Sequence, residues 1–248
     1  MRSILLEVCV DDAAGLEAAV EGGADRIELC SALGLGGLTP TAGLMALASK
    51  VPVPVYAMIR PRPGNFVFSE SEVGMMCIEI DAVRAAGLSG VVLGANLADG
   101  RLDLNTLDRL VARAGGMGLT LHRAFDLVPD FSQALESAVA LGFERILTSG
   151  GEKTAPEGTA QLAAAVEQAG GRISIMPGSG VTEATIAGLL SRLPVSEVHS
   201  SCSSAEPAQD PRLVSLGFAP PVTRKTRASL VQGLKADLLT HGRSLLRL

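Results

Sequence analysis

Short apolar runs alternate with helical segments along almost the whole chain, and this alternation constrains the fold more than any other feature. Strands that alternate with helices form a parallel sheet joined by right-handed crossovers. Because most of the runs are apolar at nearly every position, both faces of that sheet should be covered. Eight such runs are present, at residues 4–10, 25–30, 53–60, 90–93, 119–123, 145–148, 172–176 and 197–200. Eight strand–helix units in 248 residues predict an α/β protein with the TIM (β/α)8 barrel fold, as a single domain over residues 1–248.

Local signals mark where the intervening helices begin. Ser69 and Glu72 form a capping-box pattern, and Thr182 is a capping residue before the seventh helix. A doubly wound open sheet is the alternative fold, but the first turn lacks the Gly-x-Gly-x-x-Gly pattern with which such sheets open their first helix. Residues 201–225, rich in Ser, Pro and Ala, are predicted to be irregular and to delay the eighth helix to about 226–247. That helix most simply docks on the barrel, with a dimer contact as the alternative.

Charge and composition exclude several classes of protein. The net charge of −5 argues against nucleic-acid binding, which usually requires a basic surface. No segment has the roughly 20 apolar residues of a membrane span. The first apolar run ends at Val10, too early for a signal peptide. The four cysteines show no disulfide framework, so we expect reduced thiols and a cytoplasmic protein.

Thiols and carboxylates recur at the ends of the first two predicted strands. Both runs close on Glu-x-Cys, formed by Glu7 with Cys9 and by Glu28 with Cys30. Alternate residues of a strand share one face, so each Glu points the same way as its Cys. Because parallel barrels have their active sites at the carboxyl ends of the strands, these four side chains should converge there.

Cys9 and Cys30 are candidate metal ligands, because thiolates are soft donors that suit Cu(I) or Zn(II). His199 and Cys202 follow the eighth strand, which lies beside the first in a closed barrel, and either could be a third ligand. No Cys-x-x-Cys spacing supports a metal site. The alternative is that both cysteines are small buried apolar side chains, the common role of a free cysteine.

Glu7 and Glu28 are candidate acid–base residues, because two carboxylates held close together raise one of the two pKa values. The alternative is that they form salt bridges to arginines in the barrel mouth, namely Arg60, Arg62 or Arg123. The two interpretations are compatible, since a lattice of arginines and carboxylates also preorganises a site.

An imidazole, a guanidinium and a carboxylate lie at the tip of the fifth predicted strand, as His122, Arg123 and Asp126. Neighbouring residues of a strand point to opposite faces, so only one of His122 and Arg123 lines the barrel. Asp126 could orient His122 as a catalytic base; a structural hydrogen bond to the next strand is the alternative.

Three glycine-rich turns precede helices, at residues 34–40, 149–151 and 177–182, and free backbone N–H groups at a helix start attract anions. Two of these turns supply the candidate anion ligands. Ser149 and Gly150 follow the sixth predicted strand, and Gly178, Ser179 and Gly180 follow the seventh. TIM barrels often bind phosphate at the loops after strands seven and eight, which favours the second turn for phosphate or carboxylate recognition. The alternative is that the glycines serve only the geometry of tight turns.

Blocks of sequence in order along the chain, to about residue 201, resemble the CutC family of copper-homeostasis proteins. The matching blocks are Leu6-Glu7-Val8-Cys9, Gly23-Ala24-Asp25-Arg26-Ile27-Glu28-Leu29-Cys30, Gly36-Gly37-Leu38-Thr39-Pro40, Met58-Ile59-Arg60-Pro61-Arg62, His122-Arg123-Ala124-Phe125-Asp126, Leu147-Thr148-Ser149-Gly150-Gly151, Met176-Pro177-Gly178-Ser179-Gly180 and Glu197-Val198-His199. The resemblance implies a TIM barrel, a cytoplasmic homo-oligomer (homodimer or homotetramer), and copper tolerance or handling with Cu(I) bound by Cys9 and Cys30. Pro63 stands where the family's loop usually has glycine, and the chain from Ala205 onward matches no family pattern.

Two hypotheses of function follow. The first is Cu(I) binding through Cys9 and Cys30, with His199 or Cys202 as a third ligand. The second is an enzyme that acts on a small phosphorylated or carboxylated metabolite by carboxylate acid–base chemistry. In that enzyme Glu7 or Glu28 moves the proton, two arginines, Arg60 and Arg62, hold the anion, and the turn at 178–180 binds its phosphate or carboxylate.

Overall fold

Eight parallel strands form a nearly closed barrel in the structure, a computed structural model that describes residues 4–244 and the side chains of residues 4–241. Each strand pairs with its neighbour in the chain from β1 to β7, and β8 returns to pair with β1. The strands are β1 (Leu5–Val10), β2 (Arg26–Leu29), β3 (Val55–Met58), β4 (Gly90–Leu93), β5 (Gly118–Leu121), β6 (Arg145–Thr148), β7 (Ser174–Pro177) and β8 (Glu197–Ser200). Eight strands with helices between them confirm the predicted TIM barrel.

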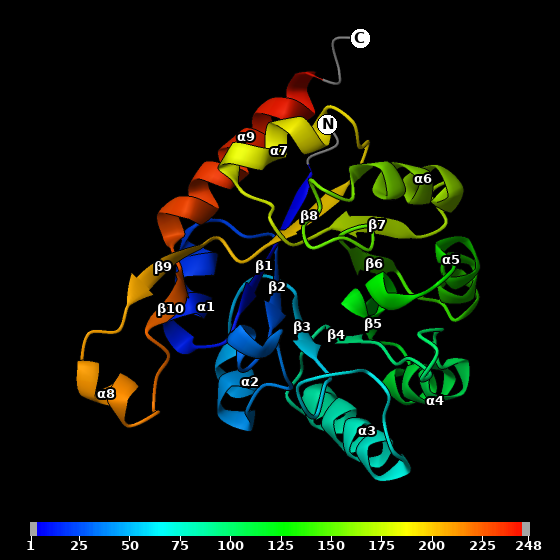
Figure 1. Ribbon diagram of the computed structural model, residues 1–248, viewed down its shortest axis with the longest axis horizontal. Coiled ribbons are helices and arrows are strands. Elements are labelled where there is room, and N and C mark those ends of the chain that lie inside the picture. Colours follow the sequence, from blue (N-terminus) through cyan, green and yellow to red (C-terminus); the bar gives the residue numbers. More distant parts are fainter. Residues whose placement is uncertain (1–3, 245–248) are drawn as a thin grey trace.

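Helices lie between successive strands and surround the barrel (Figure 1). They are α1 (Ala13–Glu21), α2 (Ala42–Ala48), α3 (Glu70–Ala85), α4 (Leu104–Ala114), α5 (Phe131–Ala140), α6 (Thr159–Ala169) and α7 (Glu183–Leu190), with short 3-10 helices at η1 (Leu33–Leu35) and η2 (Arg123–Leu127). The capping box of Ser69 and Glu72 is present at the start of α3, as predicted. Thr182 caps α7 in a reciprocal arrangement with Thr185. Among the described residues, no helix is both long enough and apolar enough to span a bilayer.

Strands β4, β6 and β8 have the predicted bounds, whereas β1, β2 and β3 are shorter than the apolar runs that predict them. The run at 53–60 is an example: only Val55–Met58 is strand. The backbone N–H of Arg60 donates to the Thr39 hydroxyl at 2.9 Å, which joins the end of this run to the loop after β2. The carboxyl ends of the strands are thereby tied to the loops of the barrel mouth.

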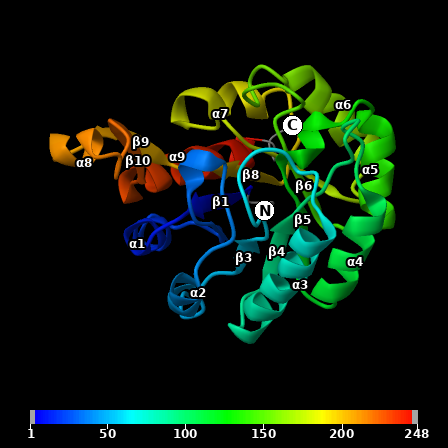
Figure 2. The same ribbon diagram turned by 60° about the horizontal axis from the view of Figure 1, so that its bottom comes forward.

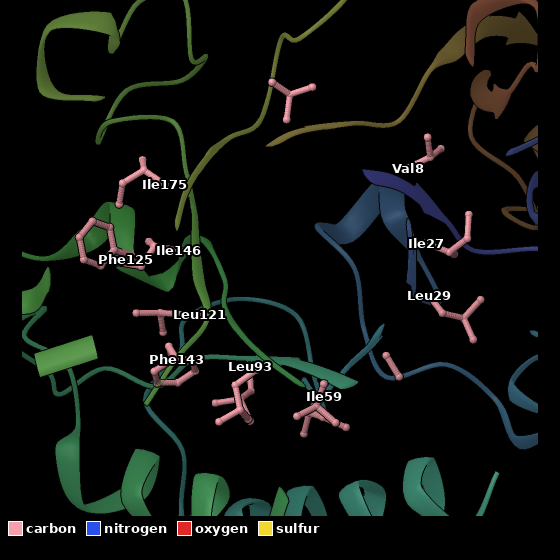
Figure 3. Packing of buried hydrophobic residues seen from close by; sticks show 14 of the residues in the cluster. Val8, Ile27, Leu29, Ile59, Leu93, Leu121, Phe125, Phe143, Ile146 and Ile175 are labelled. Atoms are coloured by element: carbon pink, nitrogen blue, oxygen red, sulfur yellow. The ribbon is translucent and has the colours of Figure 1, made fainter. Parts of the chain in front are cut away.

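The main hydrophobic core lies between the strands and the helices. Figure 3 shows members of this cluster, among them Ile59 and Leu93 on the side of the sheet that faces the helices. A second, smaller cluster consists of Cys30, Tyr56, Met58 and Val92, which alternate with members of the main core along β2, β3 and β4. The two clusters therefore occupy opposite faces of the sheet, and the second lies inside the barrel.

Residues 201–225, predicted to be irregular, contain regular elements. Strands β9 (Ser203–Pro207) and β10 (Val222–Thr226) form an antiparallel pair around the short helix α8 (Pro211–Ser215). In both views these elements extend away from the barrel (Figures 1 and 2). The two strands are polar and largely exposed, so the apolar pattern that reveals the other strands is missing here.

The last helix, α9 (Ala228–Ser244), contacts α7 and α1, which is the position of the eighth helix of a barrel. The predicted helix extends to about residue 247, and its final residues, 245–247, lie outside the described part of the chain.

Two glycines make room for the single tyrosine inside the barrel. Tyr56 pairs with Gly90, which in turn pairs with Gly118 on the next strand. A Cβ atom at Gly118 would overlap the ring and hydroxyl of Tyr56. Arg145 and Arg26 lie over the same ring, with their guanidinium carbons 4.9 and 5.4 Å from its centroid, so the ring has little freedom to move.

We therefore expect Gly118→Ala to destabilise the protein by about 1–3 kcal/mol through overpacking. Gly43, exposed on α2, is the matched control, because a Cβ atom added there would meet no other atom within 4 Å. Gly43→Ala should stabilise by up to about 1 kcal/mol, because alanine is the better helix former. Urea unfolding followed by circular dichroism measures both changes. Equal stability of Gly118→Ala and the parent chain would contradict this account of the barrel interior.

Candidate functional site

A buried ionic network fills the barrel interior below the mouth. Arg26 of β2 bridges two carboxylates, those of Glu7 on β1 and Glu197 on β8. Arg145 of β6 reaches the same Glu197 carboxylate at 3.3 Å. Glu7 is completely buried, and its second oxygen is 2.8 Å from Nδ1 of His199. Four strands, β1, β2, β6 and β8, are thus joined through charged side chains inside the barrel.

Arg26 and Glu197 are not among the site residues predicted from the sequence. The predicted partners of Glu7 are Arg60, Arg62 and Arg123, whereas the structure places Arg26 there. A signal for both residues exists, because Arg26 stands two residues before Glu28 and Glu197 two before His199. Side chains two apart on a strand share a face, so both had to point into the barrel.

The two carboxyl groups have opposite pKa shifts. Burial raises the pKa of Glu7, but the charges of Arg26 and His199 outweigh it and lower the pKa to about 2. Burial also raises the pKa of Glu28, and there the nearby charges do not reverse the effect. Glu7 is therefore a permanent carboxylate, while Glu28 takes up a proton more readily than an ordinary glutamate.

Cys9, Glu28 and His199 bring three possible metal-ligand atoms together. One sulfur, one oxygen and one nitrogen from these buried residues lie within 4.8 Å of one another. The Cys9 sulfur lies within 4.8 Å of a ring nitrogen of His199, and Nε2 of His199 is 3.8 Å from a Glu28 oxygen. Because Nδ1 of His199 faces Glu7, Nε2 is the nitrogen left for a ligand.

The other two predicted thiol positions lie beside this cluster. Cys30 is completely buried, and its thiol donates to Glu28 at 3.6 Å. Burial raises its pKa well above the ordinary value. Cys202, also buried, has a pKa raised by burial to about 11. Neither sulfur belongs to the group of three atoms within 4.8 Å, as far as the described residues show.

A cavity of about 630 Å³ opens at the mouth of the barrel next to the cluster. Its wall contains eight of the site residues predicted from the sequence: Cys9, Glu28, Arg60, His122, Arg123, Ser179, Gly180 and His199. The wall, as far as the described residues form it, does not include the seven others: Glu7, Cys30, Arg62, Asp126, Ser149, Gly150 and Gly178. The carboxyl ends of the strands thus gather most, but not all, of the predicted side chains around one cavity.

Arg60 and Arg62 diverge. The Arg62 guanidinium pairs with Glu72 at the start of α3 and donates to loop carbonyls, including that of Val67 at 2.7 Å. Strand β3 ends at Met58, and the proline-containing segment after it no longer follows strand alternation. Arg62 therefore does not line the cavity with Arg60, and the prediction that both arginines hold one anion is wrong for Arg62.

Asp126 binds the turn after β6 instead of His122. Its carboxylate accepts hydrogen bonds from the Ser149 N–H at 3.0 Å and the Gly151 N–H at 3.1 Å, and it pairs with Arg123 at 2.6 Å. The first predicted anion turn, at Ser149 and Gly150, thus holds a carboxylate of its own chain. His122 donates no hydrogen bond to Asp126 in the described structure; its Nδ1 accepts from the Ala124 N–H at 3.2 Å.

The second predicted anion turn has free donors. The Gly178 N–H donates to the Thr148 carbonyl at 3.0 Å, and the Ser179 hydroxyl donates to the Lys153 carbonyl at 2.8 Å. Among the described residues, no acceptor is found for the backbone N–H groups of 179, 180 and 181. All three of these residues line the cavity, and backbone N–H groups without acceptors before a helix are the donors that anions bind.

Comparison with known proteins gives a consistent result. The model of the CutC family matches residues 4–204. A CutC family protein of Rhizobium meliloti is 65% identical over 96% of this chain and 97% of its own length. One from Caulobacter vibrioides is 56% identical over 94% of this chain and 96% of its own. A solved CutC structure from Streptococcus agalactiae, which carries a copper-homeostasis name, superposes with a TM-score of 0.76 at 32% identity over 80% of this chain and 98% of its own.

The ionic network predicts a large effect of one isosteric change. Glu7→Gln removes the charge that faces both Arg26 and His199 in a fully buried position. Loss of one partner from a buried ion pair leaves an uncompensated charge, so we expect destabilisation by about 3 kcal/mol in urea unfolding. Glu136→Gln, which breaks a half-exposed pair with Arg172, is the control and should leave stability nearly unchanged. Similar midpoints for the two variants would show that the network contributes little.

Proposed function

This chain belongs to the CutC family, and on that premise we propose that its barrel mouth binds and handles Cu(I) through Cys9 and His199, with Cys30 as a further thiol. The observation that carries the proposal is the approach of a sulfur, a nitrogen and an oxygen within 4.8 Å in a buried position at the cavity. The relative from Streptococcus agalactiae supports it through its copper-homeostasis name.

The chemistry of the donors fits this ion. Thiolate sulfur and imidazole nitrogen suit Cu(I), whereas the hard carboxylate oxygen of Glu28 does not, so we assign the ion to Cys9 and His199. Glu7 holds the imidazole through Nδ1, which orients Nε2 toward the thiol side of the cluster. Cys30, next to Glu28, supplies the second thiol that the family resemblance implies.

The cellular setting belongs to the same proposal. All four cysteines are free, which supports a reducing compartment such as the cytoplasm. We also propose a homodimer or homotetramer; exposed apolar side chains such as Ile78 on α3 and Phe218 after α8 support it.

The test is Cu(I) binding measured anaerobically by competition with bicinchoninate. We expect roughly one high-affinity Cu(I) per chain. The double variant Cys9→Ser, Cys30→Ser should bind Cu(I) more than ~100-fold more weakly. Removing a residue that only orients a metal ligand lowers affinity by up to about 100-fold, and here the ligands themselves are removed. Cys77→Ser is the matched control, because this thiol lies on α3 outside the cavity wall. Unchanged affinity in the double variant would refute Cu(I) binding at this site.

A second candidate function is acid–base catalysis on a small phosphorylated or carboxylated metabolite. The observation that favours it is the turn after β7: residues 179–181 line the same cavity as Glu28, and their backbone N–H groups have no acceptor in the described part of the chain. The anion would bind at the turn. Glu28, whose pKa is raised by burial, would give or take the proton, and the permanently ionised Glu7 would hold the neighbouring side chains.

Thermal denaturation tests the second candidate. Glycerol 3-phosphate should raise the Tm of the protein by mass action, whereas glycerol, which has the same skeleton without the anion, should not. The backbone amides of 179–181 should shift in an NMR titration with the phosphate. The absence of any stabilisation at about 10 mM, ten times a Kd of ~1 mM, would count against a phosphate site at this turn.

A further inference from the structure

Arg60 is a buried cation without a counterion. Three arginines with described side chains are buried, namely Arg26, Arg60 and Arg145. Arg26 and Arg145 pair with carboxylates, whereas no carboxylate among the described residues lies within 4.0 Å of the Arg60 guanidinium. Its terminal nitrogens donate only to backbone carbonyls of 35, 37 and 64, at 3.1, 3.2 and 2.7 Å. A buried charge without an opposite charge is costly, so this side chain favours an anion.

Two buried hydrogen-bond donors belong to residues that line the cavity and have no acceptor among the described residues. One is Nε of Arg60, and the other is Nε2 of His122. Nδ1 of His122 accepts from the Ala124 N–H and so carries no proton. Burial, reinforced by the nearby charge of Arg60, lowers the pKa of His122 to about 3. The imidazole is therefore neutral near pH 7 with its proton on Nε2, and both atoms without partners are N–H donors.

The two donors flank one aromatic ring. The Arg60 guanidinium carbon is 4.6 Å from the centroid of Phe66, and the His122 ring is 4.9 Å from it. Phe66 is partly exposed on the loop after β3 and lines the cavity together with both donors. A shift of this side chain would uncover them to a ligand.

The rest of the wall indicates the kind of ligand. Leu33, Met58 and Leu147 provide apolar surface, which suits a carbon skeleton better than an inorganic ion. Oε1 of Glu28 is buried and lacks a partner, so it can accept from a hydroxyl or amino group. Native proteins leave few buried polar atoms unsatisfied, and three such atoms occur on residues lining this single cavity.

We propose that the cavity binds a small organic carboxylate that also carries a hydroxyl or amino group. One end of the ligand, the carboxylate, accepts hydrogen bonds from Nε of Arg60 and Nε2 of His122. The other end donates to Glu28, and the carbon skeleton lies against Phe66 and the apolar wall. The proposed carboxylate site rests on the second candidate function and names a class of substrate for it. The site does not depend on Cu(I) binding.

The three histidines of the chain make an NMR test practical. Protein labelled with 15N-histidine is titrated with lactate, malate and serine, with lactamide as the uncharged control and sodium chloride matched for ionic strength. We expect a saturable downfield shift of the His122 Nε2–H signal with at least one carboxylate and none with lactamide. The absence of a saturable shift with all three carboxylates overturns the proposal.

Variants separate a direct contact from a structural role. Arg60→Lys keeps the charge but removes the Nε donor, and His122→Phe removes the ring donor while keeping an aromatic side chain. Each should weaken binding of the best carboxylate, measured by calorimetry, by roughly 10-fold or more, the effect of one hydrogen bond to a charged group. His122→Gln, which retains a side-chain N–H donor, should bind within about threefold of the parent chain. Equal affinity of all three variants and the parent overturns the proposal, and urea unfolding checks that each variant is folded.

The glycerol 3-phosphate titration distinguishes this inference from the second candidate function. Carboxylate binding without any effect of the phosphate would refute the phosphate turn but support the carboxylate site. Phosphate binding at 179–181, with no carboxylate effect on His122, would refute the carboxylate site and leave the second candidate standing.

Discussion

The contact of Arg26 with two buried carboxylates is the interaction on which the barrel mouth depends. One guanidinium joins β2 to Glu7 on β1 and to Glu197 on β8. Glu7 also contacts Nδ1 of His199. Arg26 therefore positions the His199 imidazole indirectly, through Glu7. The cluster of Cys9, Glu28 and His199 is therefore positioned by a layer of side chains below it, and not only by the backbone of the strands.

This layer of charged side chains occupies the part of the interior that branched apolar side chains usually fill in a TIM barrel. Arg26 and Arg145 lie over the ring of Tyr56, and two glycines leave space for that ring. Charged groups below and a cavity above give the donor cluster two different environments. Its lower side is buried and ion-paired, while its upper side faces a cavity of about 630 Å³ lined by residues whose donors have no acceptor among the described residues.

Much of the fold follows from the sequence, because eight apolar runs with helical segments between them favour a barrel over the alternative, a doubly wound open sheet. The alternation of side chains along strands also identified Cys9, Glu28 and His199, three residues that the structure brings together. The same rule applied to Arg26 would have completed the network, but a charged residue at the start of a strand is easily taken for a surface residue.

Other contacts of the site depend on loops, whose paths a periodic pattern does not describe. Arg62 stands two residues after Arg60 yet turns away to Glu72, because the strand has already ended. Asp126 is four residues from His122 and binds the next turn instead. The pair β9 and β10 shows the same limit, since polar strands that pair only with each other carry no apolar alternation.

The protonation state of His122 has a consequence for how the cavity responds to its surroundings. Most histidines change charge between about pH 5 and 8, and sites that contain them change their ligand preference with acidity. An imidazole whose pKa is about 3, with Nδ1 tied to a backbone N–H, offers the same donor across that whole interval. The hydrogen-bond donor that His122 presents in the barrel mouth therefore stays the same when the pH falls within this interval.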